Sequence, residues 1–149
     1  TIMSGNRQYT SAGAGVTHSE FNPSKIDRAH FLQIWLQPNK RGGEPIYAEK
    51  PLGALAADSS LALLCSGHPR AGAIAIRQDA DVYLGRLATE KSLTIDLAPG
   101  RAAWIQVIAG RLEVLGNWLE AGDGAAVSDV ATFDIGSRGT SEFLLFDLS

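Results

Sequence analysis

Residues 60–149 consist of short apolar runs, each ended within a few positions by Gly, Asp or Ser. Alternating runs of about 4–8 residues between turn residues are typical of half-buried β-strands. The turn residues lie closest together in VIAGRLEVLGNWLEAGDG (107–124), which indicates hairpins. No window shows the apolar period of a long amphipathic helix. The chain is therefore predicted to be all-β, with a sandwich or barrel architecture.

The N-terminal part of the chain is less regular. A further strand is predicted over AHFLQIWL (29–36), because its even-numbered residues fall on one face and its odd-numbered residues on the other. The next stretch, PNKRGGEPIYAEKPLG (38–53), holds three prolines and three glycines and is predicted to be a linker or long loop. A length of 149 residues suggests one domain, or one and a fraction.

Two segments of the sequence echo each other. Residues 1–12 (TIMSGNRQYTSA) resemble residues 118–129 (WLEAGDGAAVSD), with Gly5 matching Gly122. In both segments the glycine precedes Asn or Asp, so a turn followed by a strand is expected. So short an echo also arises by chance. If it reflects a repeat, the chain carries one whole copy of a β-fold and the end of another.

Charge and composition exclude several classes of function. The net charge is −3, and the densest positive patch, NKRGG (39–43), holds two charges, so an electrostatic nucleic-acid footprint is not expected. No window approaches the ~20 apolar residues of a membrane span, and the first residues lack a signal-peptide pattern. Cys65 is the single cysteine, which fits a reducing cytoplasm. Within the apolar run LALLCSG it is expected to be a small buried hydrophobe.

The segment SAGAGVTHSEFNP (11–23) raises the question of a metal site. His18 and Glu20 are spaced i, i+2, so on a strand both side chains would point to the same face. Imidazole nitrogen and carboxylate oxygen together suit Fe(II), Mn, Ni, Cu or Zn. The His-x-Glu pair is common by chance, however, and taken alone it favours an ordinary polar strand face.

The other histidines and two aspartates receive structural interpretations. His30 is expected to be a hydrogen-bonded side chain at the edge of a core, and His68, in the turn SGHPRAG, is expected to be exposed. Asp79 and Asp81 in RQDADVY share a strand face or flank a turn, and an exposed turn is favoured. No histidine follows His68, so the β-fold of residues 54–149 cannot house a histidine-rich metal site.

Several of these stretches together resemble the bacterial pirin family, whose members are bicupins with two cupin β-barrels (double-stranded β-helices, or jelly rolls) in one chain. The resemblance covers essentially all of residues 1–149. Its most specific part combines Ser-Ala-Gly-x-Gly-Val-x-His-Ser-Glu with a following Leu-Gln-Ile-Trp. It implies a bicupin with an incomplete N-terminal barrel: a remnant over 1–37, the linker over 38–53 and a complete C-terminal barrel over 54–149. The stretches that carry it are SAGAGVTHSEFNPS, HFLQIWLQPNKRGGEPIYAEK, RQDADVYLGRL, LAPGRAAWIQVIAGRLEVLG, LEAGDGAAVS and LLFDL.

The resemblance also implies a metal centre. In the family, the N-terminal cupin binds one metal through three histidines and a glutamate, and the last two of these ligands match His18 and Glu20. The first two come from an earlier His-Pro-His-Arg-Gly-type motif that this sequence lacks, so it looks like a pirin without the front of its N-terminal barrel. The family's second cupin is generally metal-free. The 149 residues on their own are therefore expected to bind metal weakly or not at all.

Two functions are expected from the resemblance. The first is a metal-dependent quercetin 2,3-dioxygenase: a divalent ion, Fe(II) before Ni, Mn, Cu or Zn, serves a flavonol-like substrate and dioxygen, and Glu20 accepts the flavonol hydroxyl proton. The second is a non-enzymatic, metal-poor cupin module with a binding or regulatory role that acts through protein contacts. In either case the N-terminal remnant is expected to pair with a missing N-terminal segment, a second copy of the chain or the C-terminal barrel. No dioxygenase activity is expected of the 149 residues alone.

Overall fold

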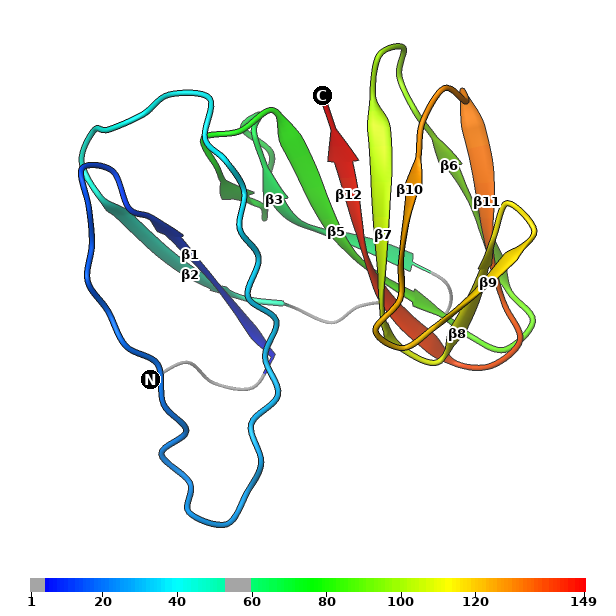
Figure 1. The fold of residues 1–149 in the computed structure, drawn as a ribbon, viewed down its shortest axis with the longest axis horizontal. Helices are drawn as coiled ribbons and strands as arrows, with labels where there is room; N and C mark the ends of the chain where they lie inside the picture. The colour runs from blue at the N-terminus through cyan, green and yellow to red at the C-terminus, as the bar shows by residue number, and fades with distance from the viewer. Residues whose placement is uncertain (1–4, 53–59) are drawn as a thin grey trace.

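The computed structural model describes residues 5–52 and 60–149, which form strands, turns and irregular segments. Figure 1 shows two parts: a β-sandwich made by residues 60–149 and, beside it, a two-stranded ribbon with a long loop. The described residues contain no helix, and hence none long and apolar enough to cross a membrane. The prediction of an all-β chain is confirmed. The strands are β1 (Asn6–Ser11), β2 (Ile46–Pro51), β3 (Ser60–Ser66), β4 (Ile74–Ala75), β5 (Ala80–Leu87), β6 (Ser92–Asp96), β7 (Ala102–Ala109), β8 (Arg111–Val114), β9 (Asn117–Glu120), β10 (Gly124–Val127), β11 (Thr132–Ser137) and β12 (Ser141–Leu148).

The sandwich consists of two sheets that share one apolar core. The larger sheet has the strand order β10-β7-β12-β5-β3-β4, and the smaller has the order β6-β11-β8-β9. Strands far apart in sequence are neighbours, as in jelly rolls: β12 pairs with both β5 and β7. Side chains from both sheets fill the space between them, and Phe143, Ile105, Leu112 and Ile135 are 0% exposed.

The larger sheet is buried on both faces. Phe143 of β12 belongs to the main core, whereas its neighbour Leu144 belongs to a second apolar cluster. Leu36 and Leu52 from the N-terminal part pack against that second cluster. This two-sided burial explains why β12 is an almost continuous apolar run, since strict alternation is expected only where one face of a sheet meets water.

The N-terminal part is a ribbon in which β1 and β2 pair antiparallel along their whole length. Residues 12–45 connect the two strands as a long loop without regular strands. Two cationic side chains hold the ribbon on the sandwich. Lys50 Nζ donates to the carbonyl of Ala73 at 2.8 Å, and Arg7 Nη2 donates to the carbonyl of Gly72.

One predicted strand is wrong. Residues 29–36 are irregular, and the side chains of Phe31 and Trp35 are exposed. Alternation is not sufficient for a strand, because the backbone N–H and C=O groups also need a neighbouring strand edge. Residues 46–51, which lie in the predicted linker, form β2 instead.

Much of the remaining prediction from turn residues is confirmed. A hairpin joins β8 to β9 within residues 107–124, with Leu115 (φ 49°) and Gly116 (φ 77°) at the turn. In the internal echo, Gly5 (φ 78°) and Gly122 (φ 96°) both adopt positive φ shortly before a strand. The domain boundaries proposed from sequence stay predictions, and residues 1–4 and 53–59 lie outside the described residues.

Candidate metal centre

His18 and Glu20 lie in the long loop and not on a strand. The loop nevertheless brings their donor atoms together, because His18 Nε2 and Glu20 Oε1 are 4.0 Å apart. Both side chains are accessible, with exposed fractions of 47% and 40%. Bonds from a transition metal to nitrogen or oxygen are about 2.0–2.2 Å long, so an ion between these two atoms reaches both on a nearly straight line, and the two side chains would approach further to bind it as neighbouring ligands. The donor chemistry fits two ligands of a divalent ion, and the loop places the two side chains near each other.

The other histidines lie elsewhere. His30 is exposed in the irregular part of the loop, so its predicted position at a core edge is wrong. His68 is exposed, as predicted, and its Nε2 lies 3.6 Å from Asp79 Oδ1. Within residues 5–52 and 60–149, no three His, Cys, Asp or Glu side chains are grouped so that they could hold a metal ion. Among the described residues, the pair of His18 and Glu20 has no third ligand beside it.

One end of the sandwich carries a network of ion pairs around Arg101. Its Nη1 lies 3.0 Å from Asp79 Oδ1, its Nε pairs with the carboxylate of Asp147, and its Nη2 donates to the Asp147 carbonyl at 3.0 Å. Burial disfavours the charged guanidinium, but the hydrogen bonds to Asp147 and Asp79 and the negative charges of these two carboxylates together outweigh burial and raise the pKa of Arg101. The network joins the segment before β5, the residue before β7 and the end of β12.

Asp81 does not lie in an exposed turn, as the sequence had suggested. It belongs to β5 opposite Ser66 of β3, and its side chain is only 6% exposed. Its Oδ2 lies 3.1 Å from Arg70 Nη1 and accepts the Tyr83 hydroxyl at 3.3 Å. Partial burial, followed by the charge of Asp81, raises the pKa of Tyr83. Asp81 is thus a structural carboxylate in a charged, half-buried cluster.

Cys65 is partly buried against the second apolar cluster, close to the predicted role of a small buried hydrophobe. Burial is the main reason why the pKa of its thiol is raised. A raised pKa keeps the thiol protonated near neutral pH, so Cys65 is a poor nucleophile there.

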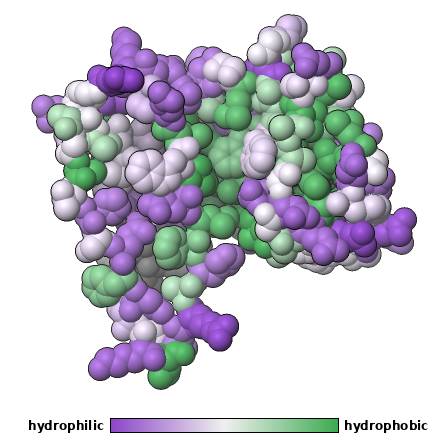
Figure 2. Space-filling model, viewed as in Figure 1, coloured by the Kyte–Doolittle hydropathy of each residue, from purple (hydrophilic) through white to green (hydrophobic). Residues whose placement is uncertain are grey.

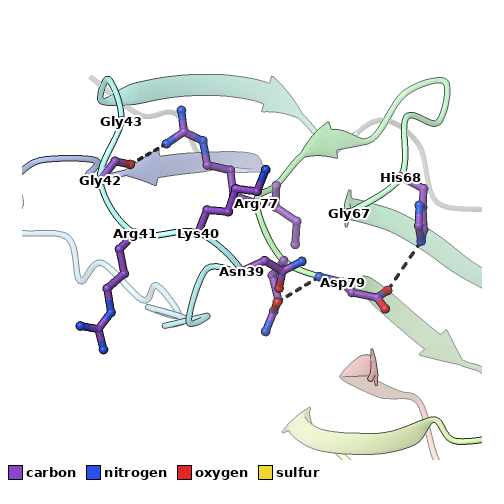
Figure 3. Close-up of a pocket in the computed structure, with 11 residues that line it drawn as sticks. Asn39, Lys40, Arg41, Gly42, Gly43, Gly67, His68, Arg77 and Asp79 are labelled. Atoms are coloured by element: carbon purple, nitrogen blue, oxygen red, sulfur yellow. Dashed lines mark hydrogen bonds and ion pairs between the residues drawn. The ribbon is translucent and has the colours of Figure 1, made fainter.

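A cavity of about 480 Å³ lies at the seam between the long loop and the sandwich, and Figure 3 shows the residues that line it. Residues 39–43 of the loop form one wall. Residues 67–68 and 76–79 of the sandwich form the other. The apolar Ile76 is buried, and seven of the eleven residues that line the cavity have polar or charged side chains.

The loop also exposes large apolar side chains. Ile26, Trp35 and Phe21 are 91%, 87% and 83% exposed. In Figure 2 apolar surface appears at the tip of the loop and in the recess between the loop and the sandwich. Exposed apolar surface of this extent is typical of regions that contact another chain or a ligand.

Known proteins share this fold and this sequence. Residues 63–148 match the family described as the quercetinase C-terminal cupin domain. The crystal structure of YhhW from Escherichia coli covers 99% of the chain with a TM-score of 0.92 and 34% identity. The chain belongs to the pirin family. A second structure of the same bacterial pirin, described as a complex with nickel(II), gives a TM-score of 0.90.

Curated relatives of this pirin carry the name of an enzyme. A protein named quercetin 2,3-dioxygenase from Escherichia coli strain K12 is 34% identical over 147 residues. A putative quercetin 2,3-dioxygenase from Pasteurella multocida is 37% identical over 149 residues. These matches cover 99% of the chain but only 62% and 63% of the two relatives, so the chain spans less than two thirds of their length. The fold is that of a cupin, and the bicupin resemblance seen in the sequence is confirmed at the level of the family.

Sequence reasoning missed two arginines, one that connects the two parts of the molecule and one that joins strand ends within the sandwich. Arg77 spans the seam and Arg101 joins strand ends, yet neither lies in a motif with a characteristic spacing. The one available signal was the pair Gly42 and Gly43, because adjacent glycines often mark a place where the backbone is approached closely.

Proposed function

We propose that this pirin chain contributes to the metal centre of a quercetin 2,3-dioxygenase-like protein, with His18 and Glu20 as two of the ligands. The proposal is carried by the 4.0 Å approach of His18 Nε2 to Glu20 Oε1 on an accessible loop. A relative of 34% identity that is described in complex with nickel(II) supports a divalent metal. Fe(II) and Ni(II) are the first candidates, since imidazole and carboxylate ligands suit both ions.

The residues of this chain would divide the chemistry between them. When bound, the ion supplies a Lewis-acid and redox centre for the oxygen-dependent opening of a flavonol ring. The Glu20 carboxylate is a proton acceptor next to His18 and would take the proton of the flavonol hydroxyl. Exposed aromatic side chains of the same loop, Phe21 and Phe31, offer surface to an aromatic ligand.

The test is metal binding and flavonol consumption by the protein as expressed from its gene, loaded with Fe(II) or Ni(II). His18→Ala is expected to weaken metal binding by about 100-fold, because loss of one ligand removes a direct metal bond. His68→Ala is the matched control, since His68 is an exposed histidine paired with Asp79. Glu20→Gln, which keeps the shape and removes the base, is expected to lower turnover more than metal occupancy.

Full metal occupancy without any flavonol consumption would overturn the oxygenase assignment. Equal metal affinities of the wild type, His18→Ala and His68→Ala would overturn the ligand assignment. The 149 residues on their own are expected to bind the ion weakly and to lack turnover, since two ligands hold a divalent ion less tightly than four.

A non-enzymatic module that acts through protein contacts is the second candidate. It is favoured by the exposed apolar side chains of the long loop, above all Ile26 and Trp35. The double variant Ile26→Ser, Trp35→Ser should then abolish association with the partner, which is either a further segment of protein chain or a second copy of this chain. The sandwich should stay folded. Retained association, measured by sedimentation at several protein concentrations, would count against this candidate.

A further inference from the structure

Arg77 ties the sandwich to the long loop, as Figure 3 shows. Its Nη1 donates to the carbonyl of Gly42 at 3.2 Å, and its Nη2 donates to that of Glu44 at 3.3 Å. Gly43, between these two residues, accepts the backbone N–H of Ala14 at 3.0 Å. One short stretch of the loop therefore contacts the sandwich on one side and the turn after β1 on the other.

The backbone at this contact is closely packed. Gly42 and Gly43 have φ values of 71° and 84°, a region in which residues with a Cβ are strained. A Cβ on Gly43 would lie 3.0 Å from Arg77 Nη1, and a Cβ on Gly13 would overlap the Gly43 carbonyl. Glycine at these positions lets the guanidinium, the stretch around Gly43 and the turn at Gly13 approach one another. The close approach limits the positions that the turn can take.

The turn lies directly before the candidate ligands. Ala14 precedes His18 by four residues, and Gly15 N donates to the Ala12 carbonyl at 2.8 Å within the turn. Within residues 12–20, Ala14 is the position whose backbone donates to a distant segment of the chain. The Ala14–Gly43 bond continues the antiparallel register of β1 and β2, and Arg77 fixes the same stretch to the sandwich. The entry of the segment that carries His18 and Glu20 is thus held at Ala14, and Arg77 connects that point to the sandwich.

We propose that Arg77 is a positioning residue for the metal centre: it acts through the loop backbone to hold the segment with His18 and Glu20, and it touches neither metal nor substrate. The inference rests on the proposed function for the metal. For the clamp, by which we mean the bonds of Arg77 to Gly42 and Glu44 together with the bond of Ala14 to Gly43, it rests on the hydrogen bonds themselves. It gives the sandwich a role in a site that lies outside it. Residues that orient metal ligands typically change metal affinity 10–100-fold when they are removed.

The test compares Arg77→Ala with Arg77→Lys and with the control Arg86→Ala in the protein as expressed from its gene. Arg86 is a half-exposed arginine of the same sandwich that pairs with Glu142 at 2.7 Å, away from the loop. Arg77→Ala is expected to weaken Ni(II) affinity about tenfold and to speed hydrogen exchange of the Ala14 amide about tenfold in the metal-free protein. Arg77→Lys should restore part of the Ni(II) affinity and part of the protection of the Ala14 amide. The rescue is partial because an ammonium lacks the fixed fork with which a guanidinium bonds two carbonyls. Arg86→Ala should change neither the Ni(II) affinity nor the exchange rate of the Ala14 amide by more than about twofold.

The two readouts separate the clamp from the proposed function. If the wild-type protein fails to bind Ni(II), the proposed metal centre fails, and with it the role of Arg77 in that centre, while exchange still reports the clamp. If the Ala14 amide exchanges equally fast in the wild type and Arg77→Ala, the clamp itself is overturned whatever the metal does. If the Ala14 amide exchanges faster in Arg77→Ala but the Ni(II) affinity is unchanged, the clamp stands and only the positioning role of Arg77 is overturned.

Discussion

Apolar side chains are buried in the sandwich and exposed in the N-terminal part, although both parts alternate apolar and polar residues. Phe143 of the sandwich is 0% exposed, whereas Phe21 of the long loop is 83% exposed. Nine of the twelve large apolar side chains found exposed in the described residues belong to residues 5–52, which are about a third of those residues. The difference teaches that an alternating sequence becomes a strand only where a neighbouring strand pairs its backbone, and that its apolar side chains are buried only where a second sheet covers them.

Polar contacts differ between the two parts in the same way. Arg101 in the sandwich is mostly buried and contacts Asp79 and Asp147. In the ribbon, exposed Glu49 accepts hydrogen bonds from Asn6 Nδ2 at 2.7 Å and from a tyrosine hydroxyl at 3.0 Å, and these bonds lower its pKa. Contacts of the second kind compete with water and contribute little to stability.

The largest effect is expected from matched phenylalanine truncations in the two parts. Phe143→Ala should lower the free energy of unfolding by about 3–5 kcal/mol, because it empties the centre of the main core. Phe21→Ala should change it by less than about 0.5 kcal/mol, because that ring is already in water. Urea unfolding followed by tryptophan fluorescence measures both. A large loss for Phe21→Ala would mean that the long loop is buried in the protein.

A smaller effect is expected from the two kinds of polar contact. Arg101→Ala should lower the free energy of unfolding by about 2 kcal/mol, because it leaves the carboxylates of Asp79 and Asp147 without their cation. Glu49→Gln should leave stability unchanged, since its partners can bond to water. Thermal unfolding at pH 7 compares the two variants. Similar midpoints for Arg101→Ala and the wild type would show that the ion-pair network is energetically neutral.

The smallest effect concerns two tyrosines whose pKa values are both raised. The folded-state pKa of Tyr83 is raised mainly by burial, so its contribution to stability is complete below about pH 10 and is lost as pH rises through the folded-state pKa. Tyr83→Phe should therefore make the alkaline decline of stability less steep. The pKa of Tyr47 is raised first by its hydrogen bond to Glu49. Because Tyr47 is fully exposed, Tyr47→Phe should leave the alkaline decline of stability unchanged. Unfolding curves between pH 9 and pH 11 measure the slopes, and equal flattening by both variants would contradict the comparison.

The sandwich was largely predictable from the sequence, whereas the arrangement of the N-terminal part was not. The strands from β5 to β12 follow local alternation and turn residues, including the hairpin at Leu115 and Gly116. The strand predicted over 29–36 has the same kind of pattern but is irregular, because no alternating pattern reveals whether a partner edge is present. Asp81 was misplaced for a related reason: its burial depends on where β3 and β5 pair, which is a long-range property.

The sequence by itself determined the all-β character, the pirin resemblance and the His18-x-Glu20 pair, since each is a property of residues close together in the chain or of shared motifs. Only the tertiary structure decided that a loop and not a strand brings His18 Nε2 to 4.0 Å from Glu20 Oε1. It alone placed Arg77 against the Gly42 and Glu44 carbonyls. Such contacts join residues more than thirty positions apart, and their formation depends on how the ribbon docks on the sandwich, for which no local spacing rule exists.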